Sequence, residues 1–122
     1  MRVTHTSAPV VVASDMSRTL SQRFGERIAI VDDARRASFT YVDVDVVVGP
    51  DTVIHPCVFL EGSTRVGAAC EIHSGARLVN ATLGDRVTVR NHTVITDTVV
   101  KAGAVLGPFA HLRPGSEVGE DA

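Results

Sequence analysis

Aliphatic residues recur every six positions through the second two-thirds of the chain. With one step shortened to five residues after Leu78 and another after Ile95, this count gives fourteen positions that all hold Val, Ile or Leu. They are Val42, Val48, Ile54, Leu60, Val66, Ile72, Leu78, Leu83, Val89, Ile95, Val100, Leu106, Leu112 and Val118. A helix repeats its apolar face about every 3.6 residues and a half-buried strand about every two. The six-residue period therefore favours neither a helix nor a long simple strand.

A small or β-branched residue follows most of these aliphatics by four positions, and we expect it to share the interior with them. This second set is Val46, Thr52, Val58, Thr64, Cys70, Ala76, Val87, Thr93, Val99, Ala104, Ala110, Ser116 and Ala122. Short strands separated by tight corners explain both sets. Three six-residue repeats, or hexads, then form one coil of a triangular prism. Each strand pairs in parallel with the equivalent strand of the next coil, about 4.8 Å away.

The two shortened steps lie seventeen positions apart, which is one coil of the predicted prism. They place Asn80 and Asp97 at the same corner of successive coils, where we expect stacked tight turns that keep the register. The sequence therefore predicts an all-β fold, a parallel β-helix of hexapeptide repeats over residues 42–122.

Residues 1–41 show none of this six-residue phase and are expected to form a short mixed α/β segment. The pattern predicts a strand over residues 10–13, a helix over 14–25 that begins at the potential cap Ser14, and a strand over 28–31. So few elements cannot bury a core of their own. We expect the segment to cap the open edge of the first coil, with partial disorder as the alternative.

Composition narrows the function classes. The formal net charge is −2 and the aromatic content is 4%, so nothing favours nucleic acid or an anionic membrane as a partner. The apolar run from Pro9 to Ala13 is too short for a signal-peptide core or a membrane span, and we expect a cytoplasmic protein. Cys57 and Cys70 lack CxxC spacing and are expected to be free thiols.

Three strings carry a resemblance to a known family: "VDVDVVVGPDTVIHPCVFLEGSTRVG", "LGDRVTV" and "GPFAHLRPGSEVGEDA". The chain resembles the start of the left-handed β-helix of bacterial bifunctional N-acetylglucosamine-1-phosphate uridylyltransferase/glucosamine-1-phosphate acetyltransferases. The resemblance implies a left-handed coil, although parallel crossovers are usually right-handed. It also implies a homotrimer that takes a sugar-phosphate substrate, with acetyl-CoA and magnesium as cofactors of the full-length enzyme, in UDP-N-acetylglucosamine synthesis for the peptidoglycan cell wall.

Only one functional residue of that family maps onto this chain. Arg113, in "HLRPG", matches the arginine that the family places at the sugar-phosphate pocket, a task suited to the fixed fork of guanidinium donors. The segments that carry the family's general-base histidine and its lysine are expected beyond Ala122, so no catalytic residue is assigned here.

The glycine-rich nucleotide loop of the uridylyltransferase domain is not matched either. The nearest string, "VVVASDMSRTL", holds Asp15 and Ser17 where such a loop needs glycines. We therefore expect the chain alone to be inactive and to bind no cofactor, and whether it acts as part of an enzyme stays open. The alternative is a non-catalytic β-helical scaffold or oligomerisation module.

Three histidines are candidates for a functional role: His55, His73 and His111. His55 and His73 lie eighteen residues apart and should stack on adjacent coils, where two imidazoles could share a metal ion. Zinc needs at least three protein ligands, and the sequence shows no clear third one, so we expect a surface ladder without a metal. His111 lies beside the inward Leu112 and is expected to be a surface residue.

Overall fold

The computed structural model describes residues 10–12, 29–30, 40–43 and 45–122. In this part of the chain every regular element is a strand. The strands are β1 (Val10–Val12), β2 (Ala29–Ile30), β3 (Thr40–Val42), β4 (Val47–Val48), β5 (Val53–Ile54), β6 (Phe59–Glu61), β7 (Arg65–Val66), β8 (Glu71–Ile72), β9 (Arg77–Val79), β10 (Thr82–Leu83), β11 (Thr88–Val89), β12 (Val94–Thr96), β13 (Val99–Val100), β14 (Val105–Leu106), β15 (His111–Leu112) and β16 (Glu117–Val118).

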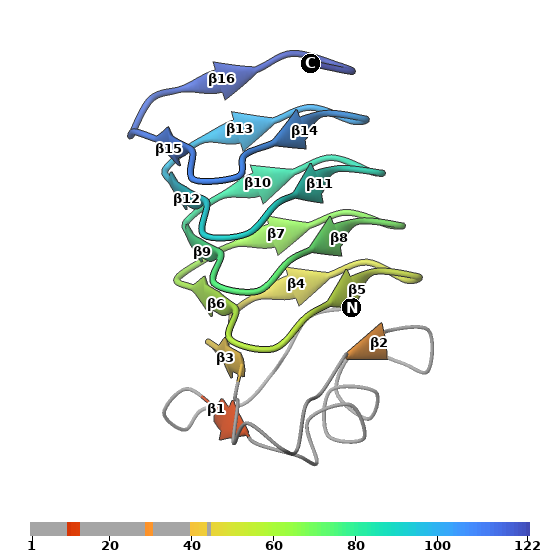
Figure 1. Cartoon of the computed structure of the whole chain (residues 1–122), viewed down its shortest axis with the longest axis vertical. Coiled ribbons are helices and arrows are strands. Elements are labelled where there is room, and N and C mark those ends of the chain that lie inside the picture. Colours follow the sequence, from red (N-terminus) through yellow and green to blue (C-terminus); the bar gives the residue numbers. More distant parts are fainter. Residues whose placement is uncertain (1–9, 13–28, 31–39, 44) are drawn as a thin grey trace.

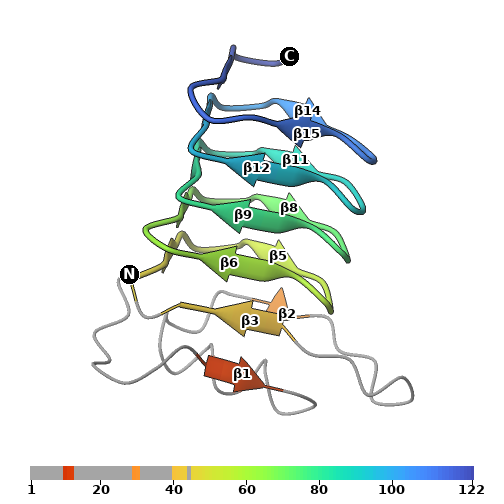
Figure 2. The ribbon, with the colours of Figure 1, turned by 90° about the vertical axis from the view of Figure 1, so that its left-hand side faces the viewer.

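The strands form three sheets, the three sides of a left-handed β-helix whose coils stack along the long axis in Figure 1. One sheet has the order β1-β3-β6-β9-β12-β15, the second β16-β13-β10-β7-β4, and the third β14-β11-β8-β5-β2. Apart from β1, each strand lies beside the strand three places further along the chain, and Figure 2 shows β6, β9, β12 and β15 stacked in this way. The predicted fold class is confirmed.

The interior follows the six-residue phase closely. We call the fourteen recurring aliphatic positions rungs. Twelve of them, from Val42 to Leu106, are at most 7% exposed. The remaining two, Leu112 and Val118, are only partly buried against this core. They belong to the last coil of the stack, which has a neighbouring coil on one side and none above it in this chain.

The second predicted set of inward residues needs a correction at the shortened steps. Val99 was expected inside but is 47% exposed, whereas Ala81 and Thr98 are buried at 0% and 1%. Each lies two residues before the next rung, because side chains in a strand alternate between the two faces. The shortened step thus removes a corner residue and leaves the alternation intact. Ala122, also predicted inside, is exposed.

The shortened steps form the stacked corners that the sequence predicts. Asn80 and Asp97 both have left-handed backbone conformations, with φ of 50° and 46°, as short polar residues tolerate. The amide of Asp97 donates to the carbonyl of Val79 at 2.9 Å, one coil below. The side chain of Asn80 accepts a hydrogen bond from the amide of Ser63 at 2.9 Å, so each corner also holds its neighbour.

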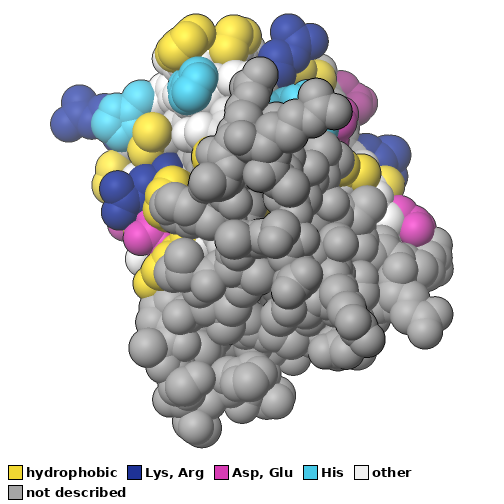
Figure 3. Space-filling model, turned by 60° about the horizontal axis from the view of Figure 1, so that its bottom comes forward, with side chains coloured by type: hydrophobic (Ala, Val, Ile, Leu, Met, Phe, Trp, Pro, Cys, Tyr) yellow, Lys and Arg dark blue, Asp and Glu magenta, His cyan; other side chains and the backbone are white. Residues whose placement is uncertain are grey.

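Two predicted strands of the N-terminal segment are present. β1 pairs antiparallel with β3, and β2 pairs parallel with β5. The helix expected over residues 14–25 lies outside the described residues, and the division of the chain at residue 41 stays a prediction. Among the described residues there is no helix long and apolar enough to cross a membrane. The described side chains visible from the N-terminal end intersperse charges of both signs with histidine and apolar groups (Figure 3).

Candidate functional site

Arg113 lies on the outer surface of the last coil, directly after β15. Its side chain is exposed, as expected for the residue that follows an inward rung. Its backbone is fixed, because the Arg113 carbonyl accepts hydrogen bonds from the hydroxyls of Ser116 at 2.6 Å and Thr98 at 3.1 Å. A rigid corner therefore presents a guanidinium group to solvent.

The turn that leads into β15 is shaped by a glycine and an aromatic ring. Gly107 has φ of +89°, and a Cβ there would lie 2.1 Å from the hydroxyl oxygen of Thr93, so no other residue fits without rearrangement. The peptide bond to Pro108 is cis. Phe109 is 76% exposed and its ring stacks on His92, with centroids 5.3 Å apart. The string "GPFAHLRPG" thus places the large apolar side chain of Phe109 on the surface.

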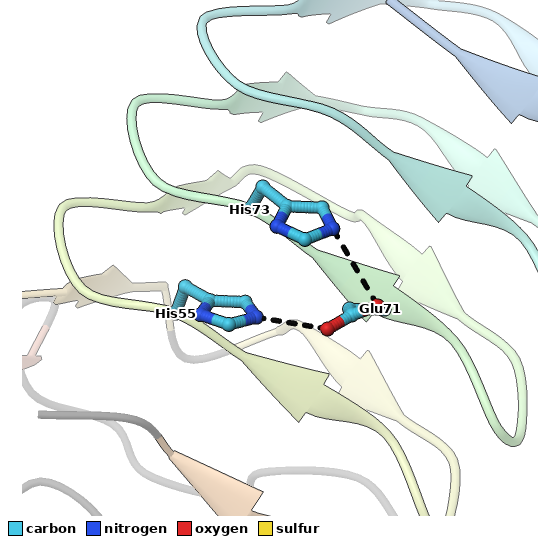
Figure 4. A group of neighbouring side chains, drawn as sticks. All are labelled: His55, Glu71 and His73. Atoms are coloured by element: carbon cyan, nitrogen blue, oxygen red, sulfur yellow. Dashed lines mark hydrogen bonds and ion pairs between the residues drawn. The ribbon is translucent and has the colours of Figure 1, made fainter.

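A second cluster joins His55, Glu71 and His73 on the outer face of the β5–β8 sheet (Figure 4). Glu71 Oε2 lies 3.0 Å from His55 Nε2, and Glu71 Oε1 lies 3.5 Å from His73 Nε2. The two imidazoles stack with centroids 4.7 Å apart and an interplanar angle of 12°. The expected ladder of histidines is present, but the expectation that no third potential ligand lies on this face is wrong, because Glu71 lies between the two imidazoles.

The electrostatics of this cluster favour the charged form of Glu71. The pKa of the carboxyl is lowered, chiefly by the hydrogen bond with His55 and further by the two imidazoles, while desolvation acts in the opposite direction. A carboxylate and two imidazoles of this arrangement could hold a cation, and the atoms they offer all lie within 4.8 Å of one another.

A shallow cleft of about 340 Å³ lies over β3, β6 and β9, lined by Tyr41, Phe59, Glu61 and Arg77. Arg77 donates two hydrogen bonds to Glu61, at 2.5 Å and 3.2 Å, and this pairing raises the pKa of the guanidinium. The Tyr41 and Phe59 rings lie side by side, with centroids 6.0 Å apart. The arginine of this cleft is therefore already engaged by a carboxylate.

The remaining candidate residues lie as expected. Cys57 and Cys70 are free, the first exposed and the second buried. Burial raises the pKa of the Cys70 thiol, and its Sγ donates to the carbonyl of Gly84 at 3.2 Å, as an inert packing residue would. His111 is exposed.

A family model described as the GMPPB C-terminal domain matches residues 39–122, which include every coil from β3 onward. The chain belongs to this family. Curated proteins also match this chain. The bifunctional protein GlmU of Anaeromyxobacter sp. (strain Fw109-5) is 52% identical over 80 residues, covering 66% of this chain and 16% of the relative. The bifunctional protein GlmU of Koribacter versatilis (strain Ellin345) is 48% identical over 81 residues, covering 66% and 17%.

A longer match is made by the bifunctional protein GlmU of Mycolicibacterium smegmatis (strain ATCC 700084 / mc(2)155). It is 38% identical over 117 residues and covers 91% of this chain and 23% of the relative, so it reaches into the segment before the hexads. These matches confirm the resemblance to the bifunctional enzymes. The chain spans about a sixth to a quarter of the length of these relatives.

Solved structures give weaker similarity. PerB from Caulobacter crescentus, in complex with CoA and GDP-perosamine, has a TM-score of 0.35 and 16% identity over 72% of this chain and 46% of that chain. The acetyltransferase domain of PglB from Neisseria gonorrhoeae FA1090, in complex with acetyl coenzyme A, has a TM-score of 0.31 and 19% identity over 75% and 48%.

Glu71 is the site residue that sequence reasoning missed. It comes two residues before His73, and both flank the inward Ile72, so strand alternation places them on the same outer face. The histidine pair is found by comparing positions one coil apart. Such a comparison does not find Glu71, which lies on the same coil as His73. The signal was present in the string "EIH".

Proposed function

We propose that this chain forms the first coils of the β-helix of a bifunctional uridylyltransferase/acetyltransferase of UDP-N-acetylglucosamine synthesis, and that Arg113 binds the phosphate of the sugar-phosphate substrate. The proposal is carried by the exposed Arg113 in the "GPFAHLRPG" motif. It is supported by 52% identity to a bifunctional relative. A guanidinium held by a fixed corner can donate two parallel hydrogen bonds to phosphate oxygens.

In this proposal the 122-residue chain does not catalyse acetyl transfer by itself. The general base and the lysine implied by the resemblance come from other segments of the enzyme, and acetyl-CoA is bound there and in the clefts of a homotrimer. The magnesium of the family does not fit His55, Glu71 and His73, because it prefers oxygen ligands and two of these three groups offer nitrogen. The free thiols are in keeping with the proposed cytoplasmic location.

A chimera tests the proposal. The matching segment of the Anaeromyxobacter relative is replaced by residues 42–122 of this chain, and release of the CoA thiol is measured with acetyl-CoA and glucosamine-1-phosphate. We expect an active chimera, and we expect Arg113→Ala to lower kcat/KM by about 10- to 100-fold, because a hydrogen bond to a charged group contributes about 1.5–3 kcal/mol. Arg113→Lys should restore part of the loss.

The matched control is Lys101→Ala, which removes an exposed cation that pairs with Glu117 at 3.1 Å. It should leave kcat/KM unchanged. A folded but inactive chimera, or an Arg113→Ala chimera that equals its parent, would contradict the proposal. Turnover by the unmodified 122-residue chain would contradict the claim that it is inactive alone.

The second candidate function is a β-helical oligomerisation module, which is favoured by the exposed ring of Phe109 on the last coil. Phe109 is 76% exposed, and aromatic side chains are enriched where proteins contact one another. Light scattering on the purified chain tests it. A trimer that dissociates on Phe109→Ser would support this function, and a monomer at all concentrations would contradict both the module and the family-like assembly.

A further inference from the structure

The cluster of His55, Glu71 and His73 is built by the pairing of β5 with β8. Val53 lies opposite Glu71 and Ile54 opposite Ile72, so the next residues in register are His55 and His73. Ile54 and Ile72 are completely buried, and their neighbours therefore point outward. Two adjacent strands thus bring two imidazoles and one carboxylate to one patch of the outer face.

The spacing of the three groups is close to that of a shared metal site, since one ligand atom from each lies within 4.8 Å of the other two. Zinc binds histidine nitrogen at about 2.0–2.1 Å and carboxylate oxygen at about 2.0–2.2 Å, so two ligand atoms of a tetrahedral site lie roughly 3.3 Å apart. The Glu71 oxygens lie 3.0 Å and 3.5 Å from the two Nε2 atoms. The carboxylate thus offers one oxygen to each imidazole, and a small shift of the side chain would bring a single oxygen to both sides of an ion.

The imidazoles need one adjustment. Their planes are 12° apart and stacked, so the lone pairs of the two nitrogens run side by side rather than toward one point. For both nitrogens to point at one ion, each imidazole must rotate about χ2, a torsion with broad energy minima. The side chains are 23% and 29% exposed, so each ring has an open side from which an ion can approach.

We propose that His55, Glu71 and His73 bind one divalent ion of the zinc class and leave a fourth position to water. Imidazole and carboxylate ligands suit zinc and its first-row neighbours, and three protein ligands with one open position are the pattern of accessible zinc sites. Such an ion would link two adjacent coils through side chains, in addition to the backbone ladder. The proposal does not depend on the proposed function, which concerns the last coil.

One neighbouring charge opposes binding. Arg90 follows the pair Val89↔Ile72 in the β11–β8 register and so stands level with His73 on the next coil. The single negative charge of Glu71 leaves a bound divalent ion with a net positive charge, which this guanidinium disfavours. Replacing Arg90 with Gln should therefore tighten metal binding, a consequence that a purely structural cluster would not show.

The experiment uses the untagged 122-residue chain, freed of metal with a chelator and titrated with zinc chloride in a calorimeter. We expect one saturable zinc site per chain. Loss of a supporting hydrogen-bond partner of a metal ligand costs about 10- to 100-fold in affinity, so loss of a ligand itself in His55→Ala, Glu71→Gln or His73→Ala should cost about 100-fold or more. Circular dichroism confirms that each variant is folded.

Two histidines outside the cluster provide matched controls. His92 stacks on Phe109 and His111 is exposed on the last coil, and zinc affinity should be unchanged in His92→Ala and His111→Ala. Cobalt chloride as a second probe reports the ligands by absorption. Weak visible bands without thiolate charge transfer are expected.

Three results would overturn the proposal. They are the absence of saturable zinc binding, equal affinity in the three cluster variants and the parent chain, and a cobalt–thiolate band that places the ion on the exposed Cys57 instead.

Discussion

The middle coils and the last coil carry the same hexad, yet they hold it differently. Leu78 and Ile95, with a coil on either side, are completely buried. Leu112 and Val118 occupy the same phase one coil further on and remain partly exposed. The periodicity of a repeat thus sets the direction of each side chain, whereas the neighbouring coils set how much water it loses. The proposed phosphate-binding Arg113 lies on the less covered coil.

The largest expected difference between the two regions comes from a buried charge. Ile72→Asp places a carboxylate at a position that is 0% exposed, with an effective penalty of several kcal/mol on top of the lost apolar burial. Since domains are stable by only about 5–15 kcal/mol, we expect this variant to be unfolded by circular dichroism. Leu112→Asp reaches water at the end of the stack and should cost about 1–3 kcal/mol in urea unfolding.

The control for this pair is Arg113→Ala, an exposed substitution that should change the free energy of unfolding by no more than about 0.5 kcal/mol. Equal losses for Ile72→Asp and Leu112→Asp would show that the last coil is as closed as the middle ones. A loss on Arg113→Ala comparable to that of Ile72→Asp would contradict the outward placement of the arginine.

A pair of glycines gives the next largest difference. Gly67 and Gly119 both follow an inward rung, but a Cβ on Gly67 would lie 2.6 Å from the carbonyl oxygen of Gly84 on the next coil, and a Cβ on Gly119 meets nothing within 4 Å. Gly67→Ala forces backbone to move and should cost about 1–3 kcal/mol. Gly119→Ala should stay within about 0.5 kcal/mol, as the urea midpoints of the two variants will show.

These glycine variants also test the spacing of the coils. If Gly67→Ala and Gly119→Ala unfold at the same urea concentration, the middle coils must separate easily at this corner, and the close approach of Gly67 to Gly84 would not constrain the stack.

Much of the fold could be predicted from the sequence because its interior repeats. Each rung is large and aliphatic, so direction and pairing follow from counting. The error at Val99 arose from counting forward from a rung across a shortened corner. The inward residue is instead the one two positions before the next rung, because side chains alternate along a strand. Ala81 and Thr98 are therefore the buried residues.

The outer face does not repeat, so its chemistry was harder to foresee. The stacking of His55 and His73 followed from the coil length, but the part played by Glu71 depends on its reach across to His55, at 3.0 Å. Side-chain conformation of this kind is not encoded in the period. The outward direction of Arg113 was foreseen for the same reason as the rungs, whereas its role comes only from the family resemblance.

The smallest expected difference between the regions is a pH effect. Glu71 precedes Ile72 in a middle coil, and Glu117 precedes Val118 in the last coil. Because the hydrogen bond from His55 lowers the pKa of Glu71, its charged form stabilises the fold above about pH 4.3, the ordinary glutamate value. This stability is lost as the pH falls through the lower pKa of the folded state.

Glu71→Gln should therefore lower the free energy of unfolding near neutral pH and have no effect below both pKa values. The side chain is 45% exposed, so solvent screening keeps the loss below about 1 kcal/mol. Glu117→Gln removes an exposed pair with Lys101, whose side chains are 62% and 51% exposed, and should change stability by less than about 0.5 kcal/mol. Urea unfolding from pH 3 to pH 7 measures both. Coincident curves for the two variants would mean that the imidazoles add nothing to the charged state of Glu71, and that the middle coil is distinguished from the last by burial alone.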